Sequence, residues 1–547
     1  MGRRAVGLFA GAWSSATSAR HWPFSQLLSA ASGRAGERAS CYKPGSRVTL
    51  PQLIHDGRPL GRRHYLLLAG IFLATRLALF ALGLRLHVEL SWMFLSDLTA
   101  LRERLLETVL YFHAFAPGMN LITGWLLKLS PEHVLVTATV SFWASGYLLL
   151  AASCRLFHLL GCGRWTATAL ALALSLIPPS LYLEHLYLYT HLCTSLVSWA
   201  AVAFALALRT GKTRAWLGFF LICAVLGWLY TTFHLFWFVM LAGVALLFAG
   251  RGGRRTVLLG AAFPLLVLTS LYAKNYALFG VFGATSWGGA NVTLSTTQRM
   301  PAQLKREWIE SGRLSPFAGI SVFAGPSEYL RFLPPDLHFP WPGSNELTRP
   351  SVAAPNFNHG LFLEVNRQRA KDAAHFIRHA PLEYVRNVFA KNLPALFSST
   401  THWHKLDKEP GSPHYEHRQV LGGYERLYDQ LVHSWPLRPV GLYLFFPVFV
   451  VWGGVRTWQG LRSKGEQERR QAVLLGFCLL QVAFVVSASS AFSSVESARY
   501  RYAVEPFIWA VVVVGLRDLA CWVRQRVPRL GGLLRDGQAA GSRREPG

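Results

Sequence analysis

The sequence is dominated by apolar runs of about 20 residues, which is the length of helix that crosses a hydrocarbon core about 30 Å thick. The chain of 547 residues has room for several soluble domains, but apolar residues make up 52% of it and charged residues only 15%. We therefore predict an all-α polytopic membrane protein with about 10 transmembrane helices. The candidate spans are 65–86, 134–153, 166–183, 190–208, 215–231, 232–249, 256–274, 438–455, 471–491 and 503–516.

The basic residues bear on the kind of partner. The formal net charge of +27 is of a size that can indicate nucleic-acid binding. Lys and Arg, however, lie mainly in the two ends of the chain and in short loops between the apolar runs, as in the cytoplasmic loops of membrane proteins. No soluble stretch interleaves basic residues with exposed aromatic ones, so we predict membrane lipids as partners and no nucleic acid.

The charges of the loops also predict an orientation. If the amino terminus is cytoplasmic, every segment placed on that side is basic, whereas the short connections near Glu184 and Thr231 on the other side carry no Lys or Arg. This asymmetry places both termini in the cytoplasm. The basic segments are the arm before the first span, 155–164, 209–214, 251–255, 456–470 and the tail from 517.

The span pattern divides the chain into five parts. The segment between the seventh and eighth spans is too long for a plain connection, so we predict that it folds as a mainly helical extracytoplasmic domain. For the Arg- and Ser-rich start of the chain, a transit peptide remains an alternative to a disordered arm. The predicted parts are a basic cytoplasmic arm (1–63), a transmembrane module (64–274) whose first external loop is 87–133, the extracytoplasmic domain (275–437), a second transmembrane module (438–521) and a basic cytoplasmic tail (522–547).

Five stretches in this order carry a family resemblance: YFHAFAPGMNLITGWLLKL (111–129), IPPSLYLEHLYLYT (177–190), AKNYALFGVFGATSWGGANV (273–292), FIRHAPLEYVRNVFAKNLPALF (376–397) and ARYRYAVEPFIWAVVVVGL (498–516). Together they resemble the membrane glycosyltransferases of the GT-C superfamily, and most nearly the bacterial relatives of dolichyl-phosphate-mannose protein mannosyltransferases. The chain departs from that pattern at three places. Asp97 has no Glu beside it, Ala116 replaces the first of two prolines, and Lys274 replaces an Arg.

The resemblance implies an integral-membrane glycosyltransferase. Its donor is a polyprenyl-phosphate sugar, and its acceptor is a lipid, glycan or protein on the non-cytoplasmic face. Such a transfer needs a base for the acceptor hydroxyl, positive charge for the departing phosphate and a groove for the lipid. A lipid or glycolipid transporter or flippase is the alternative, and a non-catalytic relative is another.

The first external loop holds the predicted catalytic residues. Asp97 lies about ten residues after the first span, and we predict that it is the general base, with a pKa raised by the nearby apolar surface. A helix-capping Asp is the structural alternative. His113, just before the break at Pro117, is predicted to orient the acceptor or to touch the phosphate; an interfacial His that caps this break is its alternative.

The predicted donor-phosphate ligands come from two later segments. Arg499 and Arg501 flank Tyr500 in the last external loop, and the planar fork of Arg matches phosphate oxygens. The structural alternatives are snorkelling to the membrane interface and pairing with Glu496 and Glu505. Lys274, at the outer end of the seventh span, is a further phosphate candidate.

Three further residues are candidates for substrate binding. Glu184 and His185 lie at the outer end of a span among tyrosines, and Asn291 follows Gly288 and Gly289 in a predicted tight turn. The histidines of the predicted external domain could bind a metal, but none of their spacings is compelling, and the seven cysteines form no CxxC pair. The sequence predicts no certain cofactor, and a divalent metal ion that assists the leaving phosphate stays open.

Composition favours one membrane over another. Lys is scarce while Arg and Ala are frequent, which is typical of a GC-rich bacterial genome. We therefore predict the bacterial plasma (inner) membrane rather than the endoplasmic reticulum.

Overall fold

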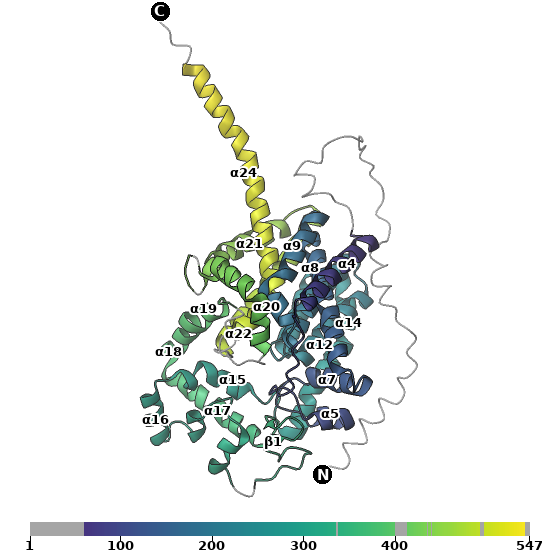
Figure 1. The fold of residues 1–547 in the computed structure, drawn as a ribbon. Helices are drawn as coiled ribbons and strands as arrows, with labels where there is room; N and C mark the ends of the chain where they lie inside the picture. Colours follow the sequence, from purple (N-terminus) through teal and green to yellow (C-terminus); the bar gives the residue numbers. More distant parts are fainter. Residues whose placement is uncertain are drawn as a thin grey trace, which may run out of the picture.

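The computed structural model describes residues 60–334, 337–399, 413–434, 436–438, 440–492 and 497–541. Helices make up most of these ranges (Figure 1), and their only sheet is a two-stranded antiparallel one of β1 (Thr348–Arg349) and β2 (Ala354–Pro355). The predicted all-α class is thus confirmed. The predicted arm 1–63 lies almost entirely outside the described residues.

Seven helical segments in these ranges are long and apolar enough to cross a membrane, which fits a multi-pass membrane protein. They are α4 (Arg62–Ala81), α8 (Val134–Leu159), α11 (Tyr189–Thr210), α14 (Gly250–Phe279), the stretch Gly441–Leu461 that contains α21 (Phe446–Leu461), α22 (Glu466–Phe492) and the part Glu505–Val523 of α24 (Glu505–Gly541).

The other predicted spans form shorter or broken helices. α9 (Arg164–Leu176) and α10 (Pro178–Glu184) meet at a bend of 64° and would make an eighth span if taken together. α12 (Thr213–Leu229) and α13 (Leu235–Phe248) have 17 and 14 residues, or about 25 Å and 21 Å at 1.5 Å per residue. The structure therefore supports seven or eight spans, and the count of about ten stays a prediction.

The bend between α9 and α10 follows from two consecutive prolines. Pro178 and Pro179 occupy the first turn of α10, and Ile177 before them has extended backbone angles of φ −60° and ψ 147°. A residue before proline is disfavoured in the helical region, so α9 ends there and the chain restarts as a new helix in another direction.

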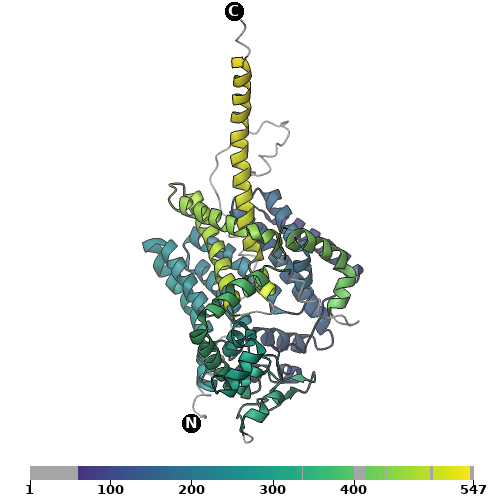
Figure 2. The same ribbon diagram turned by 90° about the vertical axis from the view of Figure 1, so that its left-hand side faces the viewer.

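Residues 288–379 of the segment 275–437 cover one end of the helical bundle, as Figures 1 and 2 both show, while α24 runs out beyond the other end. We call these ends the domain face and the opposite face. The helices of the segment are α15 (Gly288–Ser295), α16 (Ala302–Glu310), α17 (Leu361–His379), α18 (Pro381–Arg386), α19 (Leu393–Leu396) and α20 (Pro413–Asp429), with a π-helical stretch Asn387–Asn392, another at Gln430–Ser434 and four short 3₁₀ turns between Thr297 and Phe332.

The first loop, 87–133, folds as part of this segment. Its helices are α5 (Leu98–Glu103), α6 (Leu105–Leu110) and α7 (Gly118–Leu129). Phe112 and Ala114 are buried in one apolar cluster with Trp287 and Leu361 of the segment. The buried Arg349 donates hydrogen bonds to the carbonyl oxygens of three loop residues, Ser91, Trp92 and Leu95. The loop and the segment therefore share one core on the domain face of the bundle.

Candidate functional site

A cavity of about 720 Å³ lies on the domain face. It is lined by the start of α11, the loop between α12 and α13, helices α14 and α22, the short helix α23 (Ser497–Tyr502), and helices α15 and α17 of the segment. Its volume is in the range that holds a drug-sized ligand. One wall is aromatic and the other carries small polar side chains, and no acidic side chain lines it within the described ranges. The residues that carry the argument are Tyr189, Tyr230, Tyr272, Ser286, Asn291, Asn366, Arg367, Ser489 and Tyr500.

The aromatic wall has a cation against it. The ring centroids of Tyr189 and Tyr230 are 4.8 Å apart, and those of Tyr230 and Tyr500 are 5.7 Å apart. The guanidinium of the buried Arg499 lies 5.5 Å from the ring centroid of Tyr189 and 5.4 Å from that of Tyr500. Cation–π attraction holds both rings in place and puts positive charge next to the cavity. Arg499 thus lies beside the cavity, behind its aromatic lining.

The polar wall depends on a close approach of two helices. A side-chain carbon at Gly289 would lie 1.9 Å from the carbonyl oxygen of Asn366, so only glycine permits α15 to pack this closely on α17. The prediction of a tight turn here is wrong, because Gly288 and Gly289 form the first turn of helix α15. Asn291 lines the cavity from that helix.

Asn366 on this wall is buried although its side-chain amide has no hydrogen-bond partner among the described residues. It is 3% exposed, and this holds for both its amide nitrogen and its amide oxygen. The buried hydroxyl of Ser489 on α22 is in the same state. An unsatisfied buried polar group costs about 1–3 kcal/mol. Because both residues line the cavity, a ligand or an ordered water on this side can supply the missing bonds.

Sequence reasoning missed Asn366. A signal was present, since Phe362, Asn366, Ala373 and Phe376 share one face of α17 and are all buried. An Asn on the apolar stripe of an amphipathic helix needs an explanation, because buried amides are normally paired.

His113 lies one hydrogen bond behind the cavity. Its Nδ1 is 2.9 Å from the Oγ of Ser286, which lines the cavity, and its backbone nitrogen donates to the Oδ1 of Asn358 at 2.8 Å. Burial, and then the nearby charge of Lys274, lower the pKa of His113 to about 3. The imidazole is therefore neutral at pH 7 and orients the Ser286 hydroxyl without carrying charge.

Lys274 connects the bundle to the first loop. Its Nζ donates to the carbonyl oxygen of Phe112 at 2.6 Å and lies 5.4 Å from the ring centroid of Phe279. Phe279 in turn packs on His113, with ring centroids 5.0 Å apart. Lys274 thus positions the backbone next to His113, and it is not among the cavity-lining residues of the described chain.

Asp97 is fully engaged by hydrogen bonds in this structure. Its Oδ1 accepts from the backbone nitrogens of Thr99 and Ala100, as the N-cap of α5, and its Oδ2 accepts from the nitrogen and Oγ of Ser351 at 2.9 and 2.6 Å. Burial acts to raise the pKa of this carboxyl, but the Ser351 bonds and the cap bonds outweigh it, and the pKa is lowered. The expected raised pKa is therefore wrong. Asp97 does not line the cavity.

Arg501 is buried in a different environment from Arg499. It is 1% exposed, its Nε lies 3.1 Å from Oε2 of Glu505, and its NH1 donates to the carbonyl oxygens of Leu396 and Ser398. Tyr443 donates to the other oxygen of Glu505 at 2.6 Å. These contacts join α23 to α19 and α24, which is the pairing alternative that the sequence allowed.

Glu184 is held in a buried ion pair inside the bundle. Arg76 of α4 donates to its two carboxylate oxygens at 2.8 and 2.6 Å, and also to the Oγ of Ser175 at 2.8 Å. A side-chain carbon at Gly146 would come within 2.7 Å of this carboxylate, so α8 leaves the space that the pair fills. The adjacent His185 pairs its Nδ1 with the carbonyl oxygen of Leu181 at 2.7 Å.

A metal ion finds no obvious ligands in the described residues. No three side chains of His, Cys, Asp or Glu come together there in a way that could hold one. Comparison of the chain with protein-family models, with curated proteins and with solved structures found no match.

Proposed function

We propose that this chain is an integral-membrane glycosyltransferase that moves a sugar from a polyprenyl-phosphate donor to a lipid, glycan or protein acceptor. The observation that carries the proposal is the domain-face cavity, whose lining residues include Asn366 and Ser489, two buried residues with side-chain polar atoms that have no partner among the described residues. Sugar hydroxyls both donate and accept hydrogen bonds, so they match an amide and a hydroxyl that have no protein partner.

The position of the cavity suits a lipid-linked donor. It lies where α14 and α22 meet the segment 275–437, at the end of apolar helices, so a lipid tail can stay in the bilayer while its head enters. Arg499 stands behind the aromatic wall, and Arg367 is on the lining with a half-exposed side chain paired to Glu364 at 2.6 Å. These two cations are our proposed stabilisers of the departing phosphate.

In the proposed reaction the acceptor oxygen forms a bond to C1 of the sugar while the bond from C1 to the phosphate oxygen breaks. The polyprenyl phosphate leaves with that electron pair, and the acceptor proton passes to a carboxylate. We keep Asp97 as the proposed base. Because Asp97 does not line the cavity, this role requires that the acceptor bind between the cavity and the first loop. An acceptor hydroxyl would have to replace Ser351, which donates to Asp97 Oδ2 in the structure, and losing that bond would raise the carboxyl pKa toward a useful value.

The proposed orientation follows the loop charges. The domain face, with the cavity, is the non-cytoplasmic side, and both chain termini are cytoplasmic. A bacterial inner membrane is the proposed location.

One observation favours a flippase as the second candidate function. The broken pair α9–α10 ends at Glu184, which is buried in an ion pair with Arg76, and transporters use both broken helices and buried charges. The pair is closed by direct hydrogen bonds, and the large cavity lies at the domain face rather than at the middle of the bundle, so transferase remains the better fit.

The test is sugar transfer by the full-length protein reconstituted in vesicles with radiolabelled polyprenyl-phosphate sugars. We expect transfer by the parent, and a loss of about tenfold or more in Asn366→Leu because the amide bonds to the sugar are gone. Gln303→Leu is the matched control, since it removes an exposed amide from α16 of the same segment.

Two further results separate the candidates. Asp97→Asn is expected to abolish transfer and leave donor binding intact, because the carboxylate acts on the acceptor proton. Movement of a labelled lipid across the membrane with no sugar transfer to any acceptor would refute the transferase proposal and support the flippase.

A further inference from the structure

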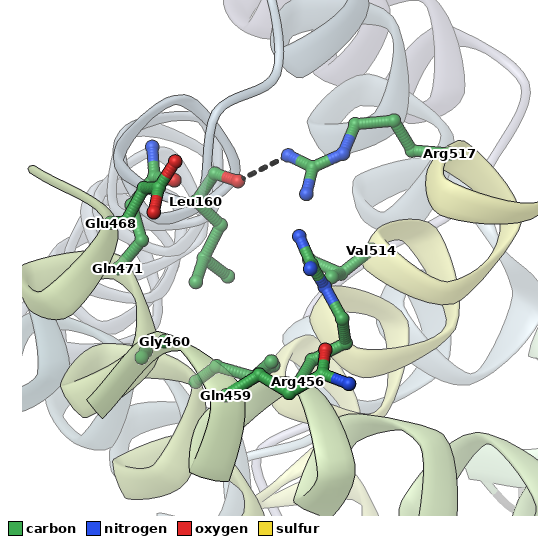
Figure 3. A pocket seen from close by; sticks show the side chains of 10 residues that line it. Leu160, Arg456, Gln459, Gly460, Glu468, Gln471, Val514 and Arg517 are labelled. Carbon is green, nitrogen blue, oxygen red and sulfur yellow. Dashed lines mark hydrogen bonds between the residues drawn. The ribbon is translucent and has the colours of Figure 1, made fainter. Parts of the chain in front are cut away.

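A second cavity, of about 150 Å³, lies at the other end of α22 between α21, α22, α24 and the carboxyl end of α8 (Figure 3). Gln471 lines it, whereas Ser489 of the same helix lines the domain-face cavity. At 1.5 Å per residue these two positions are about 27 Å apart, close to the roughly 30 Å of a hydrocarbon core. The small cavity therefore lies at the opposite membrane surface, on the opposite face.

Two arginines enter this cavity from neighbouring helices. Figure 3 shows Arg456 from α21 and Arg517 from α24 on one side of the space, with Gln471 and Glu468 across from them. Arg517 donates to the carbonyl oxygen of Leu160 at 2.7 Å and lies 3.1 Å from Oδ1 of Asp518. The Nε of Arg456 lies 2.7 Å from Oδ2 of the same Asp518.

One carboxylate thus serves two guanidinium groups. The terminal nitrogens of Arg456 make no hydrogen bond within the described chain, and its side chain is 44% exposed. The triad of Arg456, Arg517 and Asp518 has a net charge of plus one, and the terminal nitrogens of Arg456 are available as hydrogen-bond donors. An anion bound between the two arginines would neutralise this charge and accept those hydrogen bonds.

The other contents of the cavity define the anion. Its volume is below the roughly 300 Å³ at which pockets for drug-sized ligands begin, so it takes a compact group such as a phosphate. Glu468 on the far wall opposes an anion, and its Oε2 already accepts a hydrogen bond from the hydroxyl of Ser463. Around the adjoining turn the four exposed basic residues outnumber the two acids, Glu466 and Glu468. The basic residues are Arg462, Lys464, Arg469 and Arg470, of which Arg470 is paired with Glu466.

The surroundings decide the source of the phosphate. Trp458 on α21 and Trp522 on α24, close in sequence to the two arginines, are 57% and 50% exposed. Exposed Trp at this level marks the interface between lipid tails and headgroups, and basic pockets between helices at such an interface bind anionic headgroups. A free phosphate would have no use for these apolar surfaces.

We propose that this pocket binds the phosphate of an anionic lipid headgroup from the leaflet at the opposite face. The site is separate from the proposed transfer site and does not depend on it. Arg456 is the residue to change, because Arg517 also holds the backbone at Leu160, and its loss would disturb the fold.

The experiment uses native mass spectrometry of the full-length protein released from nanodiscs that contain phosphatidylglycerol or phosphatidylcholine. We expect the parent to retain phosphatidylglycerol in preference to phosphatidylcholine, and Arg456→Gln to retain it about tenfold less. Arg462→Gln, which removes the same charge from the end of the same helix outside the cavity, should retain it only about twofold less, since it loses surface charge but no cavity donor. Glu468→Gln should retain more.

Two outcomes overturn the proposal. Equal losses in Arg456→Gln and Arg462→Gln would mean that the charge of the face, and not the pocket, holds the lipid. Binding of inorganic phosphate to the detergent-purified parent, lost in Arg456→Gln and not displaced by phosphatidylglycerol, would assign the pocket to a soluble anion.

Discussion

The ion pair inside the bundle and the wall of the domain-face cavity both bury polar groups, but they satisfy them differently. Arg76 and Glu184 are each 1% exposed and are joined by two direct hydrogen bonds, with Ser175 taking a third from the same guanidinium. Asn366, at 3% exposed, has no hydrogen-bond partner for either amide atom in the described chain.

This difference separates structural polar groups from candidate binding groups. A buried charge that is fully paired within the chain needs no ligand to explain it, and removing one partner is costly. A buried amide without partners, on a residue that lines a cavity, needs a water or a ligand to complete its hydrogen bonds. The same criterion separates Arg501 from Arg456. Arg501 is paired with Glu505, whereas the terminal nitrogens of Arg456 have no hydrogen-bond partner in the described chain.

The largest expected effect comes from breaking the closed pair. Arg76→Leu should lower the free energy of unfolding by about 3–5 kcal/mol, because it leaves Glu184 charged and buried without its partner. Thermal unfolding in detergent measures the loss. The double variant with Glu184→Leu should recover most of it, and a double variant as unstable as the single one would show that the pair does more than neutralise itself.

A smaller effect is expected from pH at His113. Its pKa is lowered to about 3 in the folded protein, so below about pH 6.5 the unfolded chain binds a proton that the folded one does not. Stability contributed by this residue is then lost as pH falls, by about 2 kcal/mol at pH 5. The free energy of unfolding of His113→Gln should depend less on pH between 7 and 5 than that of the parent. An unchanged dependence would show that His113 is not buried in its neutral form.

For Asn366 we expect the opposite effect on stability. Asn366→Leu replaces an unpaired buried amide by an apolar side chain of similar shape, so stability should stay equal or rise by up to about 1 kcal/mol while sugar transfer falls. Parallel melting curves and transfer assays test this pair of signs. If stability and activity both fell, Asn366 would be a residue that stabilises the fold, like Arg76, and not a residue that binds the sugar.

The smallest effect concerns Asp97. Ser351→Ala removes the Oγ bond to its carboxylate, which should raise the lowered pKa and move the acid limb of the transfer rate to higher pH. The full pH–rate profile of parent and variant shows the shift. An acid limb that does not move would exclude Asp97 as the titrating base.

The sequence alone determined the helical membrane class, because apolar runs of span length are local patterns that each segment carries by itself. It also singled out His113, Arg499 and Asn291, which the structure brings to or next to one cavity. It could not show that Asp97 caps a helix beside Ser351 or that Gly289 starts a helix, since both depend on what packs against them.

Only the tertiary structure decided which polar groups are closed and which are open. The partners that settle this are far apart along the chain, with 108 positions between Arg76 and Glu184, 173 between His113 and Ser286, and 254 between Asp97 and Ser351. Hydrophobic periodicity fixes which face of a helix is buried, but it carries no information about the residue that meets a polar side chain there. The partner of each polar side chain is set by how the helices and the segment pack. The candidate site was identified from the polar side chains that this packing leaves without partners.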